Sequence, residues 1–487
     1  MTERLSERTL PQASRNVLRP QYDRKSTRIG IVHFGPGAFH RAHQAYYFDR
    51  LLEKDASRAI CGVSLKTSSV RDALAPQDGL YTLMELDEAP SARVIGAIRE
   101  LLVAPQSPVE VSRRLAAPET SLITMTVTEK GYCLDGVGEL DLDHPDIVHD
   151  LRNPETPRSL VGWVVRGLQL RRENGLAPYL IVCCDNLSNN GSTLRRAALA
   201  FAARRDRALA DWIEERARFP RTMVDSITPA TDATLRTRVE QTIGLEDAWP
   251  IQRERFAQWV VEETDSPGQP DWAAVGVTLS RDVCAYERAK LRLLNGAHST
   301  LAYLGLLVGL ETVAQTMAQP VLRSFIERLM QEDIQPTLLG QPTEELAAYR
   351  QSILRRFENP AIRHQLSQIA WDGSQKLPIR ILGTVADAIR ARRPLQRLAV
   401  PIAAWMSFVR ARAANNTAIV DPLAAHLATC GQRTTGDSQH DLPLFLALPG
   451  VFSTDVAGDA GFMRALSNAY DLIARRGPLD AITMVDE

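Results

Sequence analysis

The sequence has few cysteines, almost no net charge and no long apolar run. Its six cysteines are scattered over 487 residues without a C-x-x-C pair, so they predict neither a disulfide framework nor a structural zinc ribbon. The 57 basic residues are balanced by 58 acidic ones, and no overall field favours nucleic acid or an anionic membrane. We therefore expect a cytoplasmic protein that recognises a small molecule at a local site.

The sequence predicts no signal peptide and no membrane span. Residues 1–27 alternate charges of both signs without an apolar core, and we expect a loose leader. The uncharged stretch Leu293–Leu310 contains Asn295 and His298, which favours a buried core helix over a transmembrane one. We expect a monomer or a small homo-oligomer.

The chain is long enough for two or more domains, and its pattern changes near residue 284. Before that point, short apolar runs alternate with amphipathic stretches, which is typical of βαβ units. The predicted strands are Ile29–Phe34, Ala59–Leu65, Leu122–Val127 and Tyr179–Cys184. After it come long helical patterns, among them Cys284–Leu310, Val321–Gln331 and Leu346–Phe357. We predict an α/β protein with a Rossmann-type parallel-sheet domain over 28–283 and a mostly α-helical domain over 284–487.

The first predicted strand runs directly into the sequence Gly35-Pro36-Gly37-Ala38-Phe39-His40-Arg41. Gly35 permits a tight turn, and Gly37 lets backbone N–H groups approach a pyrophosphate at a helix N-terminus. Arg41 is a candidate cation beside the phosphates. His40 stands where the usual fingerprint has a third glycine, so the pattern fits a plain strand-turn-helix as well as a dinucleotide site.

The residues after the second predicted strand bear on the choice of cofactor. A carboxylate at this place accepts from the ribose 2′-hydroxyl of NAD, whereas a basic residue suits the 2′-phosphate of NADP. The chain reads Lys66-Thr67-Ser68-Ser69-Val70-Arg71, and the first carboxylate is Asp72. This segment leaves NADP open beside NAD.

Three histidines near the glycine turn raise the question of a metal. His40 and His43 are three residues apart, and no acidic residue lies close to His33, His40 or His43 in the sequence. Zinc sites need three or four suitable ligands, and loop histidines that only form hydrogen bonds are far commoner. We assign no metal.

The segment around Lys290 gathers polar side chains on an apolar helix. In a regular α-helix of about 100° per residue, Glu287 lies about 60° from Lys290, His298 about 80° and Asn295 about 140°. A partly desolvated lysine can act as the base that takes a hydroxyl proton, and an amide and an imidazole can hold the developing alkoxide. The same spacing also fits a satisfied buried network or a solvated face.

Several motifs in order make the chain resemble the mannitol dehydrogenase family of polyol-specific long-chain dehydrogenases. The resemblance runs from about Arg28 to near the C-terminus. It rests on the segments Gly35–Gln44, Thr126–Tyr132, Cys184–Asn186, Phe219–Asp225, Lys290–Ser299 and Asp372–Pro378. Within the family the chain looks most like members that act on a hexuronate, and members that act on a polyol are the near alternative.

The resemblance implies a metal-independent NAD dehydrogenase in which Lys290 is the general acid/base. It implies that Asn186, Asn295 and His298 bind or polarise the reacting oxygen, that Glu287 takes part in proton exchange, and that Asp225 orients a partner or is structural. The implied cofactor-binding residues are Gly35, Pro36, Gly37, Ala38, Phe39, Arg41, Thr128 and Glu129. A hexuronate needs a cation for its carboxylate, and Lys376 or Arg380 can supply it. The remote alternative is a nucleotide-binding module without turnover.

Overall fold

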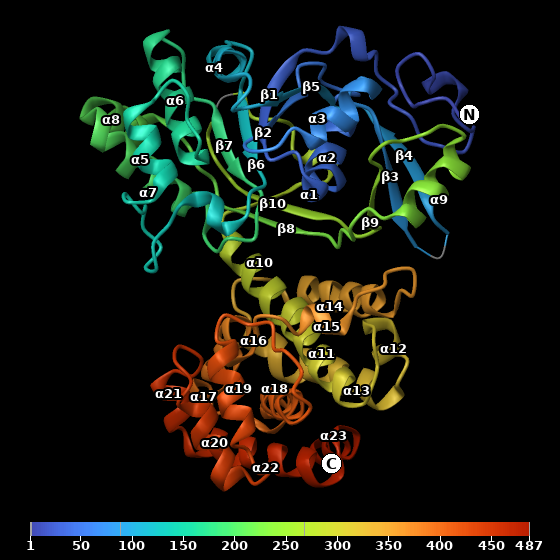
Figure 1. Cartoon of the computed structure of the whole chain (residues 1–487), viewed down its shortest axis with the longest axis vertical. Helices are drawn as coiled ribbons and strands as arrows, with labels where there is room; N and C mark the ends of the chain where they lie inside the picture. The colour runs from blue at the N-terminus through green and yellow to red at the C-terminus, as the bar shows by residue number, and fades with distance from the viewer. Residues whose placement is uncertain (1, 88, 267, 487) are drawn as a thin grey trace. The chain divides into compact units, whose positions relative to one another are not determined.

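The computed structural model describes residues 2–87, 89–266 and 268–486, which form two compact units (Figure 1). Unit 1 extends to Val283 and is an α/β unit, and unit 2 begins at Cys284 and is helical. The predicted α/β class, with a Rossmann-type unit followed by a helical one, is confirmed.

A five-stranded parallel sheet forms the centre of unit 1, in the order β5-β2-β1-β6-β7. Its strands are β1 Ile29–Phe34, β2 Ala59–Ser64, β5 Ile98–Val103, β6 Leu122–Met125 and β7 Leu180–Cys183. The four predicted strands are confirmed to within two residues at each end. Strand β5 was not predicted, because Arg99 and Glu100 interrupt its apolar run.

Both faces of this sheet are covered, which explains why its strands are nearly continuous apolar runs. Successive residues of β1 point to opposite sides. Val32 and Phe34 pack with Trp163, whereas Ile31 packs with Phe48 on the other side. The helices of unit 1 are α1 Ala38–Ala42, α2 Gln44–Leu51, α3 Ser69–Leu74, α4 Pro108–Ala116, α5 Pro145–Arg152, α6 Leu160–Glu173, α7 Asn190–Arg205, α8 Arg207–Arg216 and α9 Ala233–Ile243.

Two smaller sheets complete unit 1. One has the order β4-β3-β9 and the other β11-β10-β8. Their strands are β3 Tyr81–Leu86, β4 Ser91–Ile95, β8 Thr222–Asp225, β9 Ile251–Glu254, β10 Gln258–Glu262 and β11 Thr278–Ser280.

The N-terminal segment packs on unit 1, so the expectation of a loose leader is wrong for residues 2–27. Leu5 is fully buried, and its N–H donates to the Glu246 carbonyl at 2.8 Å. Arg24 is also buried, and its guanidinium donates to the Gly96 carbonyl at 3.0 Å. These anchors are single residues in a polar segment, so they leave no periodic pattern in the sequence.

Unit 2 is built around α18 (Gln396–Ala414), which packs against α11 (Ala297–Leu307), α19 (Ala424–Gln432) and α22 (Ala460–Arg476). The other helices are α10 Val283–Ala289, α12 Val313–Met317, α13 Pro320–Arg328, α14 Thr343–Glu358, α15 Leu366–Ile369, α16 Gly373–Leu377, α17 Gly383–Arg390, α20 Ser438–Leu446, α21 Thr454–Gly458 and α23 Pro478–Asp486. As expected, Leu301 and Leu304 of α11 are fully buried in the core of the unit. Within the described ranges, no helix is both long and apolar enough to cross a membrane.

Candidate functional site

The turn after β1 has the backbone geometry that a pyrophosphate site requires. Gly35 has a positive φ of 82°, and a Cβ there would lie 2.3 Å from the Thr126 carbonyl oxygen, so only glycine fits. Its N–H donates to the Val63 carbonyl at 2.9 Å, which ties the turn to β2. At Gly37, directly before α1, a Cβ would meet no protein atom closer than 3.9 Å. The space outside Gly37 is therefore open to a ligand that approaches the backbone closely.

Two neutral histidines support this turn from inside. His33 Nδ1 lies 2.7 Å from Thr124 Oγ1, and its Nε2 lies 3.1 Å from Thr126 Oγ1 and 3.2 Å from the Gly35 carbonyl oxygen. His40 stacks on His33 with ring centroids 3.4 Å apart. Burial lowers the pKa of His33 to about 3, so the ring carries no charge at neutral pH. His40 replaces the third glycine with a packed ring.

Arg41 is not placed to meet a phosphate, and the structure contradicts this prediction. The side chain is fully buried, and Nη1 donates to the Trp249 carbonyl at 2.7 Å. Its guanidinium lies over the rings of Trp249 and Tyr81, with centroid distances of 4.9 and 5.5 Å. Phe39 stacks on His43 with ring centroids 5.0 Å apart. The cation of Arg41 thus serves packing inside unit 1.

The ends of β6 and β7 are joined by the half-buried carboxyl group of Asp185, which was not predicted from the sequence. The Tyr132 hydroxyl donates to Asp185 Oδ2, and the Leu187 N–H donates to Asp185 Oδ1 at 3.1 Å. Asn186 follows at once and is exposed. Burial raises the pKa of Asp185 to about 6. The available signal was a carboxylate directly after a buried strand.

Three more predicted residues of unit 1 lie at strand ends. Thr128 and Glu129 are exposed just after β6, where Thr128 precedes a short 3-10 helix. Asp225 ends β8, is buried, and pairs in register with Gln258 of β10. Exposed groups at the end of a parallel strand are available to a ligand, whereas burial makes Asp225 suited to holding a neighbour in place.

We expect replacement of Asp185 by asparagine to stabilise the protein relative to the wild type as pH rises. The raised pKa means that folding favours the protonated carboxyl group, so ionisation costs stability between the ordinary pKa of 3.8 and about 6, and the cost stays constant above that range. A shift of this size corresponds to about 3 kcal/mol at most. Thermal unfolding of both proteins from pH 4.5 to 7.5 measures the effect.

The exposed Asp143→Asn variant is the matched control, and its unfolding temperature should follow that of the wild type at every pH. A difference between Asp185→Asn and wild type that does not change with pH would contradict the prediction.

In unit 2, Lys290 stands at the start of a π-helical segment, Lys290–Gly296, that separates α10 from α11. The expectation of one regular α-helix is wrong here. Hydrogen bonds in a π-helix span five residues, and each residue turns by about 80°, so Asn295 lies about 45° from Lys290 instead of about 140°. By the same reckoning His298 lies about 40° to the other side, while Glu287 keeps its place about 60° away. The π segment draws Lys290, Asn295 and His298 onto one narrow face.

His298 lies in an electropositive environment. Its ring stacks on Phe357 at 5.3 Å between centroids, and His364 is 5.2 Å away. Nε2 is buried, and none of the described residues forms a hydrogen bond with it. Burial holds the pKa of His298 well below 6.5, and four positive or protonatable side chains add to this effect: His364, Arg380, Arg356 and Lys376. His298 is therefore neutral at physiological pH.

The predicted cations Lys376 and Arg380 lie beside this helix. A Cβ at Gly296 would be 2.9 Å from the Arg380 carbonyl oxygen, so the glycine permits the close approach of the two segments. Arg380 Nη1 donates to Ser299 Oγ at 3.0 Å. Lys376 Nζ donates to the Trp371 carbonyl at 2.5 Å. Both cations thus lie near His298, but the Lys376 ammonium already donates a hydrogen bond to a backbone carbonyl.

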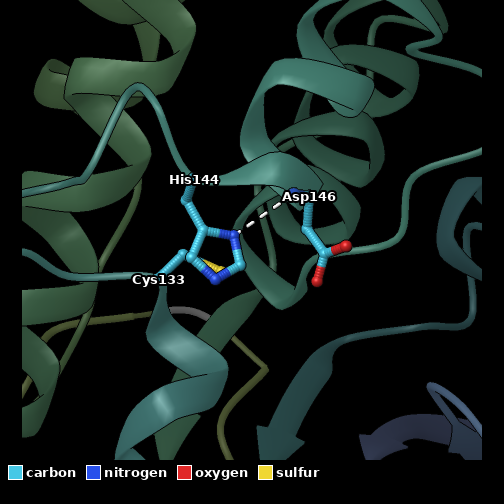
Figure 2. A group of neighbouring side chains, drawn as sticks. All are labelled: Cys133, His144 and Asp146. Atoms are coloured by element: carbon cyan, nitrogen blue, oxygen red, sulfur yellow. Dashed lines mark hydrogen bonds between the residues drawn. The ribbon is translucent and has the colours of Figure 1, made fainter.

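A group with ligand-type side chains lies in unit 1 at the start of α5. Cys133, His144 and Asp146 have potential ligand atoms within 4.8 Å of one another (Figure 2). The Asp146 N–H donates to His144 Nδ1 at 3.2 Å, so this ring caps the helix. Burial raises the pKa of the Cys133 thiol to about 11. A neutral thiol is a poor metal ligand, and the histidine ring already caps the helix. We therefore interpret this group as part of the start of α5 and not as a metal centre.

A parallel sheet with a glycine turn after its first strand, and a helix with lysine, amide and imidazole on one face, define a nicotinamide-dependent dehydrogenase. Residues 29–274 match the mannitol dehydrogenase Rossmann domain, and residues 282–474 match the mannitol dehydrogenase C-terminal domain. The chain belongs to the mannitol dehydrogenase family. It is an oxidoreductase that uses NAD and acts on a sugar alcohol or a sugar acid.

Similar proteins match nearly the whole chain. D-mannonate oxidoreductase of Escherichia coli (strain K12) is 39% identical over 97% of this chain and 99% of its own. Mannitol 2-dehydrogenase of Phaeosphaeria nodorum is 39% identical over 98% of this chain and 84% of its own. The structure is similar to that of Pseudomonas fluorescens mannitol 2-dehydrogenase in a ternary complex with NAD and D-mannitol, with a TM-score of 0.83, 36% identity and 99% of both chains covered.

Proposed function

We propose that this enzyme reduces D-fructuronate to D-mannonate with NADH and catalyses the reverse oxidation, as a step of hexuronate breakdown in the cytoplasm. Its likeness to D-mannonate oxidoreductase over 97% of the chain supports the reaction. No cysteine forms a disulfide in the described ranges, which fits a reducing compartment.

Lys290 carries the proton in this proposal. In the reduction, a bound nicotinamide would supply the hydride that the ketone carbon accepts, and the electron pair of the C=O bond would pass to the oxygen. The Lys290 ammonium donates its proton to that oxygen, which completes the alcohol. In the oxidation, the neutral amine takes the hydroxyl proton. Glu287 lies about one turn before Lys290 and is suited to pass this proton to solvent.

Neutral donors hold the reacting oxygen. His298 is neutral, so one ring nitrogen can donate a hydrogen bond without transferring its proton, and Nε2 has no partner among the described residues. The Asn295 amide lies on the same face and can donate to the same oxygen. In unit 1, we propose that the exposed amide of Asn186 acts as a hydrogen-bond donor to the substrate. The buried Asp225 would hold a neighbouring group in position.

The cofactor would be held by unit 1. Gly35, Pro36, Gly37, Ala38 and Phe39 form the turn and the start of α1, where backbone N–H groups can meet the pyrophosphate. Thr128 and Glu129, exposed after β6, are the other proposed contacts.

The observation that favours a hexuronate is the positive charge around His298. Arg380, Arg356 and Lys376 all raise the local potential. A polyol has no charge that would use this potential, whereas the carboxylate of a uronate would be attracted by it. Arg380 is the best placed of the three, because its guanidinium reaches Ser299, the neighbour of His298. The alternative is a mannitol 2-dehydrogenase, which the equal identity of 39% to such enzymes supports.

We expect kcat/KM for D-fructuronate with NADH to exceed that for D-fructose about ten- to a hundredfold, since a charge-assisted contact to a carboxylate contributes about 1.5–3 kcal/mol. Replacement of Arg380 by glutamine should remove most of this preference. It should leave kcat/KM for fructose within about threefold of the wild-type value. Steady-state assays with both ketoses measure the two ratios.

The control is Arg390→Gln, which removes an exposed arginine of the same unit. It should leave both reactions unchanged. An enzyme that turns over fructose at least as efficiently as fructuronate is a polyol dehydrogenase, and the uronate assignment would then be wrong.

A further inference from the structure

The end of β2 lies beside the glycine turn that faces the cofactor. β1 and β2 are parallel, Phe34 is in register with Val63, and the Val63 carbonyl accepts from the Gly35 N–H at 2.9 Å. In a dinucleotide-binding sheet of this topology, the adenosine ribose lies at the end of the second strand. The segment that follows β2, Leu65–Ser69, is thus where the chain meets the ribose 2′-position.

This segment contains no carboxylate, and the next one along the chain is already engaged. Asp72 of α3 accepts from the Ser68 hydroxyl at 2.5 Å. It also accepts from Arg71 through Nε at 3.0 Å and Nη2 at 2.7 Å. The carboxylate is therefore held by its own helix, and part of its charge is neutralised by Arg71. Enzymes restricted to NAD repel the 2′-phosphate with a carboxylate at this place, and that repulsion is missing here.

The groups that this segment does present suit a phosphate. Lys66 is exposed, and its ammonium has no hydrogen bond or ion pair to any described residue. Thr67 and Ser69 carry hydroxyls 3.3 Å apart that can donate to an anion. Arg71 Nη1 also bonds Gln106 at 2.7 Å, just beyond β5, which fixes a second cation near the same edge of the sheet. An ammonium and hydroxyl donors are the usual partners of a phosphate monoester.

We propose that the end of β2 forms a subsite for a 2′-phosphate, with Lys66 as its principal cation, so that the enzyme binds NADP(H) as well as NAD(H). The inference rests on the dinucleotide-binding role of unit 1 and is independent of which sugar is the substrate. Loss of Lys66 should weaken only the phosphorylated cofactor, because the 2′-hydroxyl of NAD carries no charge for the ammonium to meet.

Fluorescence titration of the full chain with NADH and with NADPH, in the absence of any sugar, tests the subsite. We expect the two Kd values to agree within about tenfold, because the Lys66 ammonium can meet the charge that the 2′-phosphate adds. Lys66→Ala should raise the Kd for NADPH about tenfold or more and change that for NADH less than twofold. Thr67→Asp, which restores a carboxylate, should weaken NADPH still further and spare NADH. 2′,5′-ADP should compete with NADPH more strongly than 5′-ADP does.

Lys54→Ala, at an exposed lysine outside the segment, should change neither Kd. A wild-type Kd for NADPH more than tenfold that for NADH would overturn the proposal, and so would a Lys66→Ala variant that weakens both cofactors equally. These readings need no turnover, so a failure to reduce fructuronate would count against the proposed function and leave this result intact.

Discussion

Replacement of Lys290 by alanine should lower kcat for ketone reduction by about three orders of magnitude, within the range that general acid–base catalysis supplies. The amine is the only group that we assign to deliver a proton to the substrate oxygen, and its neighbours Asn295 and His298 stabilise charge without transferring a proton. Kd for NADH should stay within about twofold, because the cofactor contacts belong to unit 1. Stopped-flow and steady-state assays, with fluorescence titration of NADH, measure both quantities.

Two controls accompany this variant. Thermal unfolding of Lys290→Ala should match that of the wild type, since the side chain is only half buried. The exposed Lys25→Ala variant should retain full activity. Partial recovery of Lys290→Ala by added methylamine would identify the missing group as an amine. A kcat within tenfold of the wild-type value would remove Lys290 from the proton transfer.

The second large effect is expected at the glycine turn, where two neighbouring glycines should respond differently to alanine. Gly35→Ala forces a side chain into positive φ and places its Cβ against the Thr126 carbonyl at 2.3 Å. We expect a loss of about 3 kcal/mol or more and a fall in unfolding temperature of about 5–10 °C, together with loss of NADH binding. Differential scanning calorimetry and NADH titration test both.

Gly37→Ala is the matched variant. Its Cβ meets no protein atom closer than 3.9 Å, so the fold should be unchanged, with an unfolding temperature within about 2 °C of the wild type. The added methyl group enters the space that we assign to the pyrophosphate, so the Kd for NADH should rise at least about tenfold. Equal destabilisation by both variants would show that Gly37 serves the fold and not the cofactor.

Local chemistry made much of the fold predictable. A strand buried on both faces, such as Ile29–Phe34, must be apolar throughout, and the glycine after it has to take the backbone through a turn that other residues resist. The Lys290 segment was also recognisable, because an amine, an amide and an imidazole in an apolar helix are costly unless they have a function. These features depend on residues close together in the sequence.

Features that depend on distant partners were not predictable. Arg41 is drawn inward by Trp249, some two hundred residues away, so its sequence position beside the glycines was misleading. Asp185 is recognised as a partly buried acid only when Tyr132 is placed against it. The N-terminal segment is held by single anchors such as Leu5, which no periodicity reveals. In each case the placement of the side chain depends on contacts with residues far away in the sequence.

The widened helical turn at Lys290–Gly296 also sets a rule for comparing or redesigning such sites. A π turn is equivalent to one residue inserted into an α-helix, and here the insertion is what aligns Lys290 with Asn295. Deleting a residue between them would give a more regular helix in which the asparagine, now four residues after the lysine, still lies about 40° from it. A designer who moves this pair onto an ordinary helix should therefore place the asparagine four residues after the lysine. A sequence alignment with such a helix needs a one-residue gap between the two positions, because an alignment without it would pair residues of different function.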